Sequence, residues 1–362
     1  MIDRAWLEHL GRTALPIIAI LSFASGVGAT LAVAGDTLGY DFLAYHQAAA
    51  RLIDRQPLYD MSYTESGGFG LFYYPPTFAP LILPLGLLAA PTATWVWISG
   101  SLVAFVIGVG ILPVSRTVRW WTLLLAGFSF PFVYAVKLGQ VGPVLFLAFA
   151  VGWRWLDHPL RLGISAAVGA AVKLQPGVIL AWALLTRRFR AGAAGAAVLG
   201  FLAILATLLA GILSWSDFVT LLRTVSDPIA TDQNLTPGAV AFQLGAPPSI
   251  AAALQLVSTV AAIAALLAAV RWSSDESSYL VAVIVSQLVS PILWDHYAML
   301  LLLPVAYLLA AGRWWALAIP LITAWPLIGV TPALAYPVVF WFTLLATLLV
   351  GRSARMQPAT AL

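Results

Sequence analysis

The sequence predicts an all-α polytopic membrane protein with about twelve transmembrane helices. Of its 362 residues, 62% are hydrophobic and 9% are charged, whereas about a quarter of the residues in a typical soluble domain are charged. Apolar runs near the roughly 20 residues that a helical span requires recur along the chain, separated by arginines. This composition excludes a disordered chain, a secreted disulfide scaffold and a nucleic-acid-binding protein. The absence of cysteine excludes thiolate catalysis and cysteine-ligated zinc.

The expected spans follow the apolar runs in chain order. The first is interpreted as an uncleaved helix, because its apolar core exceeds the about 7–15 residues of a signal peptide, although Ala32-Val33-Ala34 resembles a signal-peptidase site. Two long outer loops, 35–92 and 214–247, complete a single domain over residues 1–362. The spans are placed at residues 13–34, 93–112, 120–138, 141–156, 162–173, 176–186, 191–213, 248–270, 278–293, 297–311, 315–330 and 332–350.

The orientation of these spans follows from the positive-inside rule. If both termini are cytoplasmic, 13 of the 18 basic residues lie inside and nine of the 14 acidic residues lie outside. The map requires the proline-rich residues 75–91 to stay on the outer face without spanning. It also requires residues 163–186 to form a helical hairpin that turns at Lys173-Leu174-Gln175-Pro176. The alternative, one straight span, places Lys173 near the bilayer centre at a cost of at least about 2.5–3.5 kcal/mol.

Six polar residues from separate segments fall at the outer membrane boundary on this map. Singly, each has a structural explanation: Asp41 can begin a helix, Lys173 can snorkel, and His296 can be a buried hydrogen-bonded side chain. Their common depth instead favours a functional site, because ionisable groups beside a hydrocarbon core are costly. The six are Asp41, Gln140, Lys173, Gln175, Asp295 and His296.

The first outer loop contains a second signal. Residues 41–53 carry apolar side chains at helical spacing, with the acidic Asp41 at the start. This pattern predicts an amphipathic helix that lies in the membrane interface. The aromatic run that follows is typical of a membrane boundary or, alternatively, of a sugar-stacking surface, and it comprises Phe69, Phe72, Tyr73 and Tyr74.

Taken together, these segments resemble the motifs of glycosyltransferase family 87. They occur in the family's order between about residues 40 and 310. The sequence departs from the family where an Asn-Gln-Ser-like stretch is usual, since this chain has Asp232-Gln233-Asn234-Leu235-Thr236 there. The matching segments are Asp41-Phe42-x-x-Tyr45, Pro57-Leu58-Tyr59-Asp60, Tyr74-Pro75-Pro76, Gly139-Gln140-Val141, Ala171-Val172-Lys173-Leu174-Gln175-Pro176 and Ser290-Pro291-x-x-Trp294-Asp295-His296-Tyr297.

The resemblance implies the GT-C membrane fold and transfer of a sugar, best known as mannose, from a polyprenyl-phosphate donor. It implies that Asp41 is the catalytic acidic residue of the first extracytoplasmic loop and that His296 belongs to the active site. We expect Asp41 to deprotonate the acceptor hydroxyl, and Lys173 and His296 to stabilise the departing phosphate. A single base predicts one displacement with inversion. The expected substrate-binding residues are Lys173, Gln140, Gln175, Asp295, Tyr45 and Asn234.

The implied partners are a polyprenyl-phosphate sugar donor, a lipid or glycan acceptor and membrane lipids, without nucleic acid. The expected location is a bacterial inner or plasma membrane, with the active site facing the periplasm or the exterior. No cofactor or metal site is predicted, although Asp36, Asp41 and Asp295 leave dependence on a divalent ion open. Two other function classes remain as alternatives: a secondary transporter or flippase for lipid-linked sugars, and a non-catalytic assembly or export subunit.

Overall fold

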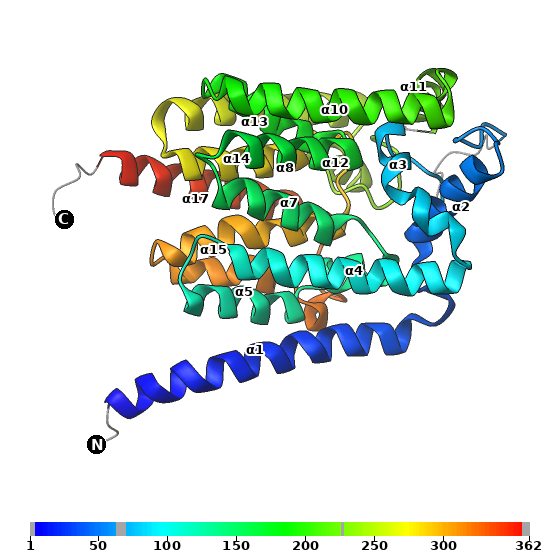
Figure 1. Cartoon of the computed structure of the whole chain (residues 1–362). Helices are drawn as coiled ribbons and strands as arrows, with labels where there is room; N and C mark the ends of the chain where they lie inside the picture. The colour runs from blue at the N-terminus through cyan, green and yellow to red at the C-terminus, as the bar shows by residue number, and fades with distance from the viewer. Residues whose placement is uncertain (1–3, 63–69, 226–227, 357–362) are drawn as a thin grey trace.

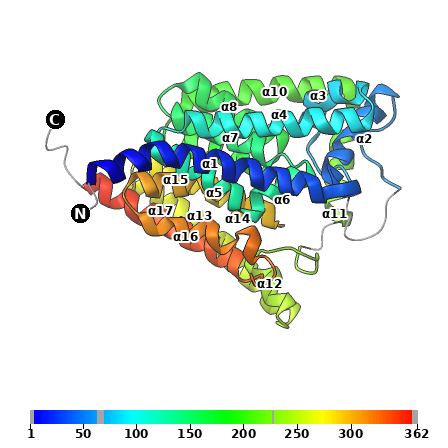
Figure 2. The ribbon, with the colours of Figure 1, turned by 90° about the horizontal axis from the view of Figure 1, so that it is seen from below.

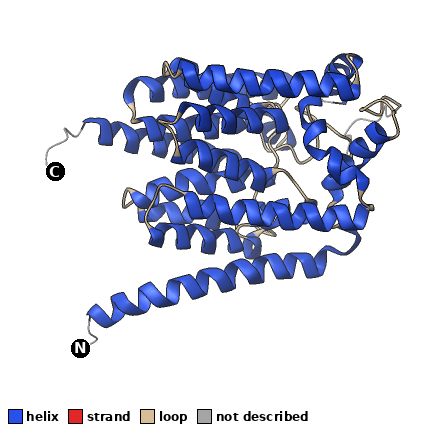
Figure 3. Cartoon of the chain, viewed as in Figure 1, coloured by secondary structure: helices blue, strands red, loops and turns tan. Residues whose placement is uncertain are grey.

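The computed structural model describes residues 4–62, 70–225 and 228–356, and over these ranges the regular structure is helical (Figure 3). No strand is formed in the described ranges, where a single isolated bridge joins Ser129 to Ala324. The all-helical expectation is therefore confirmed. The α-helices are α1 (Arg4–Ala34), α2 (Tyr40–Ile53), α3 (Ala79–Ile82), α4 (Ala90–Ile111), α5 (Arg116–Phe128), α6 (Phe130–Leu138), α7 (Gly142–Arg154), α8 (Pro159–Val172), α9 (Val178–Leu185), α10 (Phe189–Ala210), α11 (Leu213–Val225), α12 (Pro237–Gln243), α13 (Pro248–Trp272), α14 (Asp275–Leu288), α15 (Leu302–Ala310), α16 (Ala318–Ile322) and α17 (Ala335–Met356).

Short 3-10 helices connect or extend many of these elements. They are η1 (Gly35–Thr37), η2 (Pro76–Phe78), η3 (Leu83–Leu87), η4 (Gln175–Gly177), η5 (Asp295–Leu301), η6 (Trp314–Leu317) and η7 (Trp325–Leu327).

The long helices lie side by side and give the molecule two distinct ends (Figures 1 and 2). The start of α1 and the end of α17 lie at the same end of the molecule, which we call the termini end. The helices α2, α3 and α11 lie at the opposite end, which we call the α2 end. This arrangement agrees with a chain whose two termini share one side of a membrane.

Five of the described helices are long and apolar enough to cross a membrane, namely α1, α4, α10, α13 and α17. A sixth candidate is the pair α6 and α7, which bends by 119° at the break between them. The other expected spans are formed by shorter helices, so the number twelve stays a prediction. Residues 120–138, expected as one span, are two helices because Ser129 is extended and its hydroxyl caps α6 by accepting from the Phe132 N–H.

The expectation of a continuous span over residues 315–330 is wrong. This segment folds as the three short pieces η6, α16 and η7. Pro320 and Pro326 each remove a backbone donor that a continuous helix requires. In addition, the Phe130 N–H donates to the Thr323 carbonyl at 3.0 Å, which ties the broken backbone to the start of α6.

The predicted helical hairpin over residues 163–186 is present. Gly163 of α8 packs against Ala191 and Gly195 near the start of α10, and Leu184 of α9 packs against Gly192 in the same region. The start of α8 and the end of α9 therefore lie together, and the chain reverses between them. The turn falls at Lys173, whose backbone is extended. Residues 75–91 likewise avoid a long helix, as expected, and fold as η2, α3 and η3 before α4 begins.

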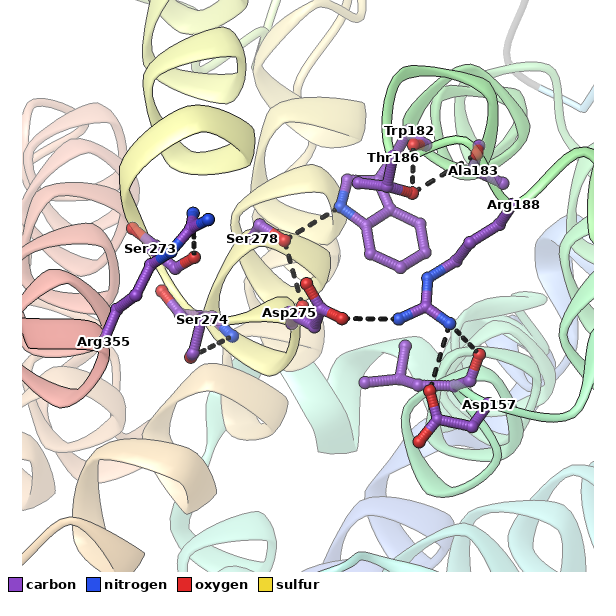
Figure 4. A network of polar contacts seen from close by, with 12 residues as sticks. Asp157, Trp182, Ala183, Thr186, Arg188, Ser273, Ser274, Asp275, Ser278 and Arg355 are labelled. Carbon is purple, nitrogen blue, oxygen red and sulfur yellow. Dashed lines mark hydrogen bonds and ion pairs between the residues drawn. The ribbon is translucent and has the colours of Figure 1, made fainter. Parts of the chain in front are cut away.

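The helix ends at the termini end are joined by an arginine network (Figure 4). Arg188 donates to the Leu156 carbonyl at 2.6 Å and pairs with Asp157 at 3.2 Å and with Asp275 at 2.6 Å. Its guanidinium also lies 5.5 Å from the ring centroid of Trp182. One side chain thus links the end of α7, the hairpin, the start of α10 and the start of α14.

We predict that Arg188→Ala lowers the free energy of unfolding by about 1–3 kcal/mol, because a buried carbonyl and the Trp182 ring lose a charged partner. Asp157→Asn is the matched control. Its side chain is 90% exposed, so its ion pair contributes little and the change stays within about 0.5 kcal/mol. Equilibrium unfolding of the detergent-solubilised protein measures both, and equal effects of the two variants would contradict the assignment.

Candidate active site

Two glycines with positive φ bring the start of α2 against the end of α6. Gly39 (φ 74°) precedes α2, and Gly139 (φ 68°) ends α6. The Gly39 N–H donates to the Lys137 carbonyl at 2.7 Å, and a Cβ atom on Gly139 would lie 2.7 Å from the Phe42 Cβ. Only residues without a side chain allow this approach in this conformation. The glycine pair therefore places Asp41 beside Gln140.

The Asp41 carboxylate is held by an amide and not by a helix cap. Gln140 Nε2 donates to Asp41 Oδ2 at 2.5 Å, and the cap position of α2 makes no side-chain hydrogen bond. Behind the amide, the hydroxyls of Tyr45 and Tyr74 lie 2.5 Å apart and 3.4 Å and 3.1 Å from Gln140 Oε1. Asp41 is half-buried, whereas Gln140 and both tyrosines are buried.

Lys173 reaches the same place from the turn between α8 and η4. Its ammonium lies 4.0 Å from the ring centroid of Tyr297 and 5.6 Å from that of Tyr74. Such contacts with ring faces stabilise a cation without neutralising it. Within the described ranges no carboxylate lies within 4.0 Å of the Lys173 ammonium.

The segment η5 supplies the remaining polar groups. Asp295 Oδ1 accepts from the His296 backbone N–H at 2.6 Å and lies 3.4 Å from His296 Nδ1. The His296 ring is 5% exposed and packs edge-on against Tyr297, with 5.0 Å between the centroids. Neither ring nitrogen has a hydrogen-bond partner in the described part of the chain. A buried imidazole in this state has unused capacity to bind a ligand.

These groups lie close enough to Asp41 to act on its charge. Burial raises the pKa of the Asp41 carboxyl above its usual value, and this effect is opposed by His296, by the Gln140 hydrogen bond and by Lys173, with Asp295 adding to the rise. The structure therefore brings Asp41, Lys173 and His296 together, as expected from the sequence, with Asp295 beside them. What each does in a reaction stays a proposal.

Gln175 makes its hydrogen bond to a residue outside this group. Its Nε2 donates to Ser290 Oγ at 2.8 Å, and Ser290 in turn donates to the Ile292 carbonyl at 2.6 Å. Gln175 therefore joins the turn after α8 to the segment that leads into η5.

Asn234 does not fit the expected sugar-binding role. Its buried amide donates to the carbonyls of Pro228 and Pro291, at 2.5 Å and 3.1 Å. Its Oδ1 accepts from the N–H groups of Leu293, at 2.9 Å, and Thr236, at 3.1 Å. All of the amide's donors and acceptors are used by backbone, so a sugar hydroxyl would have to displace one of them. Asn234 instead fixes the backbone just before η5.

The aromatic run after the first helix of the loop contributes rings to the packing. The rings of Phe72 and Tyr74 are buried among Tyr45 and Phe78, and the place of this run at a membrane boundary stays a prediction. Phe69 lies outside the described residues. The sequence names Tyr74 only as part of a matching motif and of the aromatic run, and its contacts with Gln140 and Lys173 appear only in the structure.

Within the described ranges, no three His, Asp or Glu side chains come together as a metal-binding group. Asp41 and Asp295 are part of the site, but Asp36 is not among the groups that act on the Asp41 charge.

We predict that Gly139→Ala destabilises the protein by about 1–3 kcal/mol, because the new Cβ meets Phe42 in a backbone conformation that alanine avoids. Gly100→Ala is the control, since no atom lies within 4 Å of a Cβ placed there and alanine favours a helix. Thermal unfolding compares the two. A Gly139→Ala protein as stable as Gly100→Ala would refute the close approach of α2 and α6.

Comparison with known proteins gives three findings. A family model for glycosyltransferase family 87 matches residues 72–291. The polyprenol-phosphate-mannose-dependent alpha-(1-2)-phosphatidylinositol mannoside mannosyltransferase of Mycobacterium tuberculosis is 27% identical over 289 residues, covering 71% of this chain and 67% of the relative. The polyprenol-phosphate-mannose-dependent alpha-(1-2)-phosphatidylinositol pentamannoside mannosyltransferase of Mycolicibacterium smegmatis is 28% identical over 301 residues, covering 78% and 72%. No solved structure matches the chain.

The matched region extends over more than half of the 362 residues and contains Tyr74, Gln140 and Lys173. Together with the long apolar helices, it identifies a membrane-embedded enzyme and removes the transporter and assembly-subunit alternatives. The protein belongs to glycosyltransferase family 87.

Proposed function

We propose that the enzyme transfers mannose from a polyprenyl-phosphate donor to a hydroxyl of a glycolipid acceptor related to the phosphatidylinositol mannosides. The names of both relatives support this donor and this class of acceptor. The observation that carries the proposal is that a candidate base and two candidate phosphate-binding groups lie in one place. A carboxylate, Asp41, with an amide partner lies near an ammonium, Lys173, and an imidazole, His296, whose ring nitrogens make no hydrogen bond within the described part of the chain.

In the proposed reaction, Asp41 removes the proton from the acceptor hydroxyl as its oxygen attacks C1 of mannose. The bond between C1 and the phosphate oxygen breaks, and polyprenyl phosphate leaves with the electron pair. Lys173 and His296 stabilise the charge on that phosphate, where preorganised groups away from water are most effective. The mannosylated acceptor is released with its new bond, and the Asp41 proton passes to water.

A single displacement with inversion at C1 follows from the roles of the two carboxylates. Asp295 is occupied with His296, through the backbone N–H and the nearby Nδ1. We therefore assign Asp295 to the orientation of His296 and not to a covalent intermediate. Asp41 is left as the one base, so no second nucleophile is available to invert the centre again.

The α2 end is proposed to face the periplasm or the exterior of a bacterial membrane. Many arginines flank helices at the termini end, among them Arg188 at the start of α10, Arg271 at the end of α13 and Arg355 at the end of α17. The positive-inside rule then assigns that end to the cytoplasm. In this orientation α2 lies at the outer interface, where a lipid-anchored donor presents its sugar.

The function is tested by reconstituting the protein in liposomes with radiolabelled polyprenyl-phosphate mannose and a phosphatidylinositol mannoside. The expected product is an acceptor lipid that has gained covalently bound mannose. The proposal would be overturned if the protein used only polyprenyl-phosphate donors that carry a sugar other than mannose. It would also be overturned if the label crossed the bilayer without forming a covalent product.

We predict that Asp41→Asn lowers the turnover number by about 10²–10⁴-fold, because the amide cannot accept the proton. Asp54→Asn, at the exposed C-cap of the same helix, should keep wild-type turnover. The initial rate of mannose transfer measures both variants after their folding has been checked by thermal unfolding. Near-normal turnover in folded Asp41→Asn would exclude this residue as the base.

We also predict that Lys173→Gln reduces kcat/KM for the donor by at least about tenfold, since a hydrogen bond from a charged group to the phosphate is lost. Lys137→Gln is the control, because Lys137 is the other lysine of the chain and its ammonium lies 5.8 Å from the ring centroid of Tyr134, away from Tyr297 and Tyr74. Rates at varied donor concentration separate the effects. Equal values for both variants would remove Lys173 from the phosphate site.

A further inference from the structure

The hydrogen bonds behind Asp41 form a directed chain. Each tyrosine hydroxyl has one proton to donate. Tyr74 is the nearer donor to Gln140 Oε1, at 3.1 Å against 3.4 Å for Tyr45, and the two hydroxyls are 2.5 Å apart. The arrangement that uses both hydroxyl protons over the shorter distances is Tyr45 to Tyr74 and Tyr74 to Gln140 Oε1, with Gln140 Nε2 donating to Asp41 Oδ2. Because Oε1 is occupied by hydroxyls, the amide nitrogen must face the carboxylate.

These side chains lie within the protein and not on a surface that a sugar reaches. Tyr45 is 1% exposed, Tyr74 6% and Gln140 7%. The ring of Tyr45 packs against Phe72, Phe78 and Trp97, and that of Tyr74 packs against Phe72 and Phe78. The amide therefore has a fixed direction. It holds Asp41 Oδ2 and leaves the second carboxylate oxygen, Oδ1, without a hydrogen bond from it.

Tyr74 also contacts the cation of the site. The face of its ring lies 5.6 Å from the Lys173 ammonium, while its hydroxyl is bound to Gln140. In addition, Tyr59 donates to the backbone carbonyl of Tyr74 at 2.7 Å, which fixes the residue from behind. A single buried side chain thus contacts both the amide that holds the carboxylate and the ammonium.

We propose that Gln140 and Tyr74 are positioning residues: Gln140 directs Asp41 Oδ1 toward the acceptor hydroxyl and favours the ionised carboxylate, and Tyr74 fixes both Gln140 and Lys173. This inference rests on the proposed function, because it assigns roles to Asp41 and Lys173 in that reaction. It replaces the sugar-binding role expected for Gln140 and Tyr45 with one exerted through Asp41.

The consequence for pH follows from the sign of each interaction. A hydrogen bond to the ionised form lowers the pKa of a carboxyl, so losing the Gln140 donor raises the Asp41 pKa beyond the rise that burial already causes. The base is active when ionised, so the acid limb of kcat/KM moves to higher pH. The other titratable groups that face Asp41 are Tyr45, Tyr74, Tyr134, Lys173, Asp295, His296 and Tyr297.

The test is the pH profile of mannose transfer in the wild type and four variants. Gln140→Met keeps the length of the side chain but removes the donor, and its acid limb should rise by about one pH unit or more. Tyr74→Phe keeps the ring beneath Lys173 and should shift the limb in the same direction by less, with an unchanged KM for the donor. Tyr74→Leu removes the ring as well and should also raise that KM, by about threefold or more.

Tyr279→Phe is the matched control. Tyr279 is also a buried tyrosine whose hydroxyl donates a hydrogen bond, here to the Phe149 carbonyl at 2.9 Å, but it packs on Trp182 and not on the site. Its pH profile should match that of the wild type. A purely structural role for Tyr74 and Gln140 would lower the rate of their variants without moving the limb, and that result overturns the inference.

The outcome also separates this inference from the proposed function. If neither the wild type nor Tyr279→Phe transfers mannose, the proposed function fails. If both are active and the limb stays in place in Gln140→Met and Tyr74→Phe, the positioning roles fail and the function stands. Should Gln140→Met have too little activity for a profile, Tyr74→Phe carries the test, since it loses a single oxygen atom.

Discussion

Asp41 is a carboxylate in a half-buried position among aromatic rings, and its charge is tolerable there only if other groups stabilise it. Gln140 supplies a hydrogen bond, while Lys173 and His296 supply favourable charge or polarity from two further segments. Each of these partners lies where a helix is interrupted: Gln140 between α6 and α7, Lys173 between α8 and η4, and His296 on the 3-10 helix η5. The breaks in an otherwise regular bundle are therefore the places that satisfy one buried charge.

The rest of the fold can be understood as the support for those breaks. The glycines at 39 and 139 let α2 reach the end of α6, and the small residues of α8 and α10 let these two helices pack closely. Lys173 follows α8, with its ammonium near the Tyr297 ring. The amide of Asn234 fixes the backbone that leads into η5. At the other end, Arg188 holds together the helices that carry these segments. Close packing of helices and hydrogen bonds to the backbone thus hold the segments that carry the polar groups.

Much of this arrangement was accessible from the sequence. Charge distribution and the cost of burying Lys173 indicated the hairpin, and the common depth of Asp41, Lys173 and His296 indicated their meeting. The break at Ser129 and the short pieces over 315–330 were missed. Apolar composition indicates the length of a segment, but it does not show the hydrogen bonds to other segments that satisfy the backbone where a helix ends. The roles of Asn234 and Tyr74 were missed for a related reason. An amide or a hydroxyl has the same appearance in a sequence whether it points at a ligand or at the backbone, and only the partners distinguish the two.

The order of the site residues along the chain has a consequence for biosynthesis. Asp41 is made early, Gln140 and Lys173 follow, and the His296 segment is completed only after most of the chain has left the ribosome. An incomplete chain thus contains the acidic residue without the groups that neutralise and orient it. Under the proposed reaction, a chain that ends before η5 lacks His296 and so lacks one of the two groups assigned to the departing phosphate.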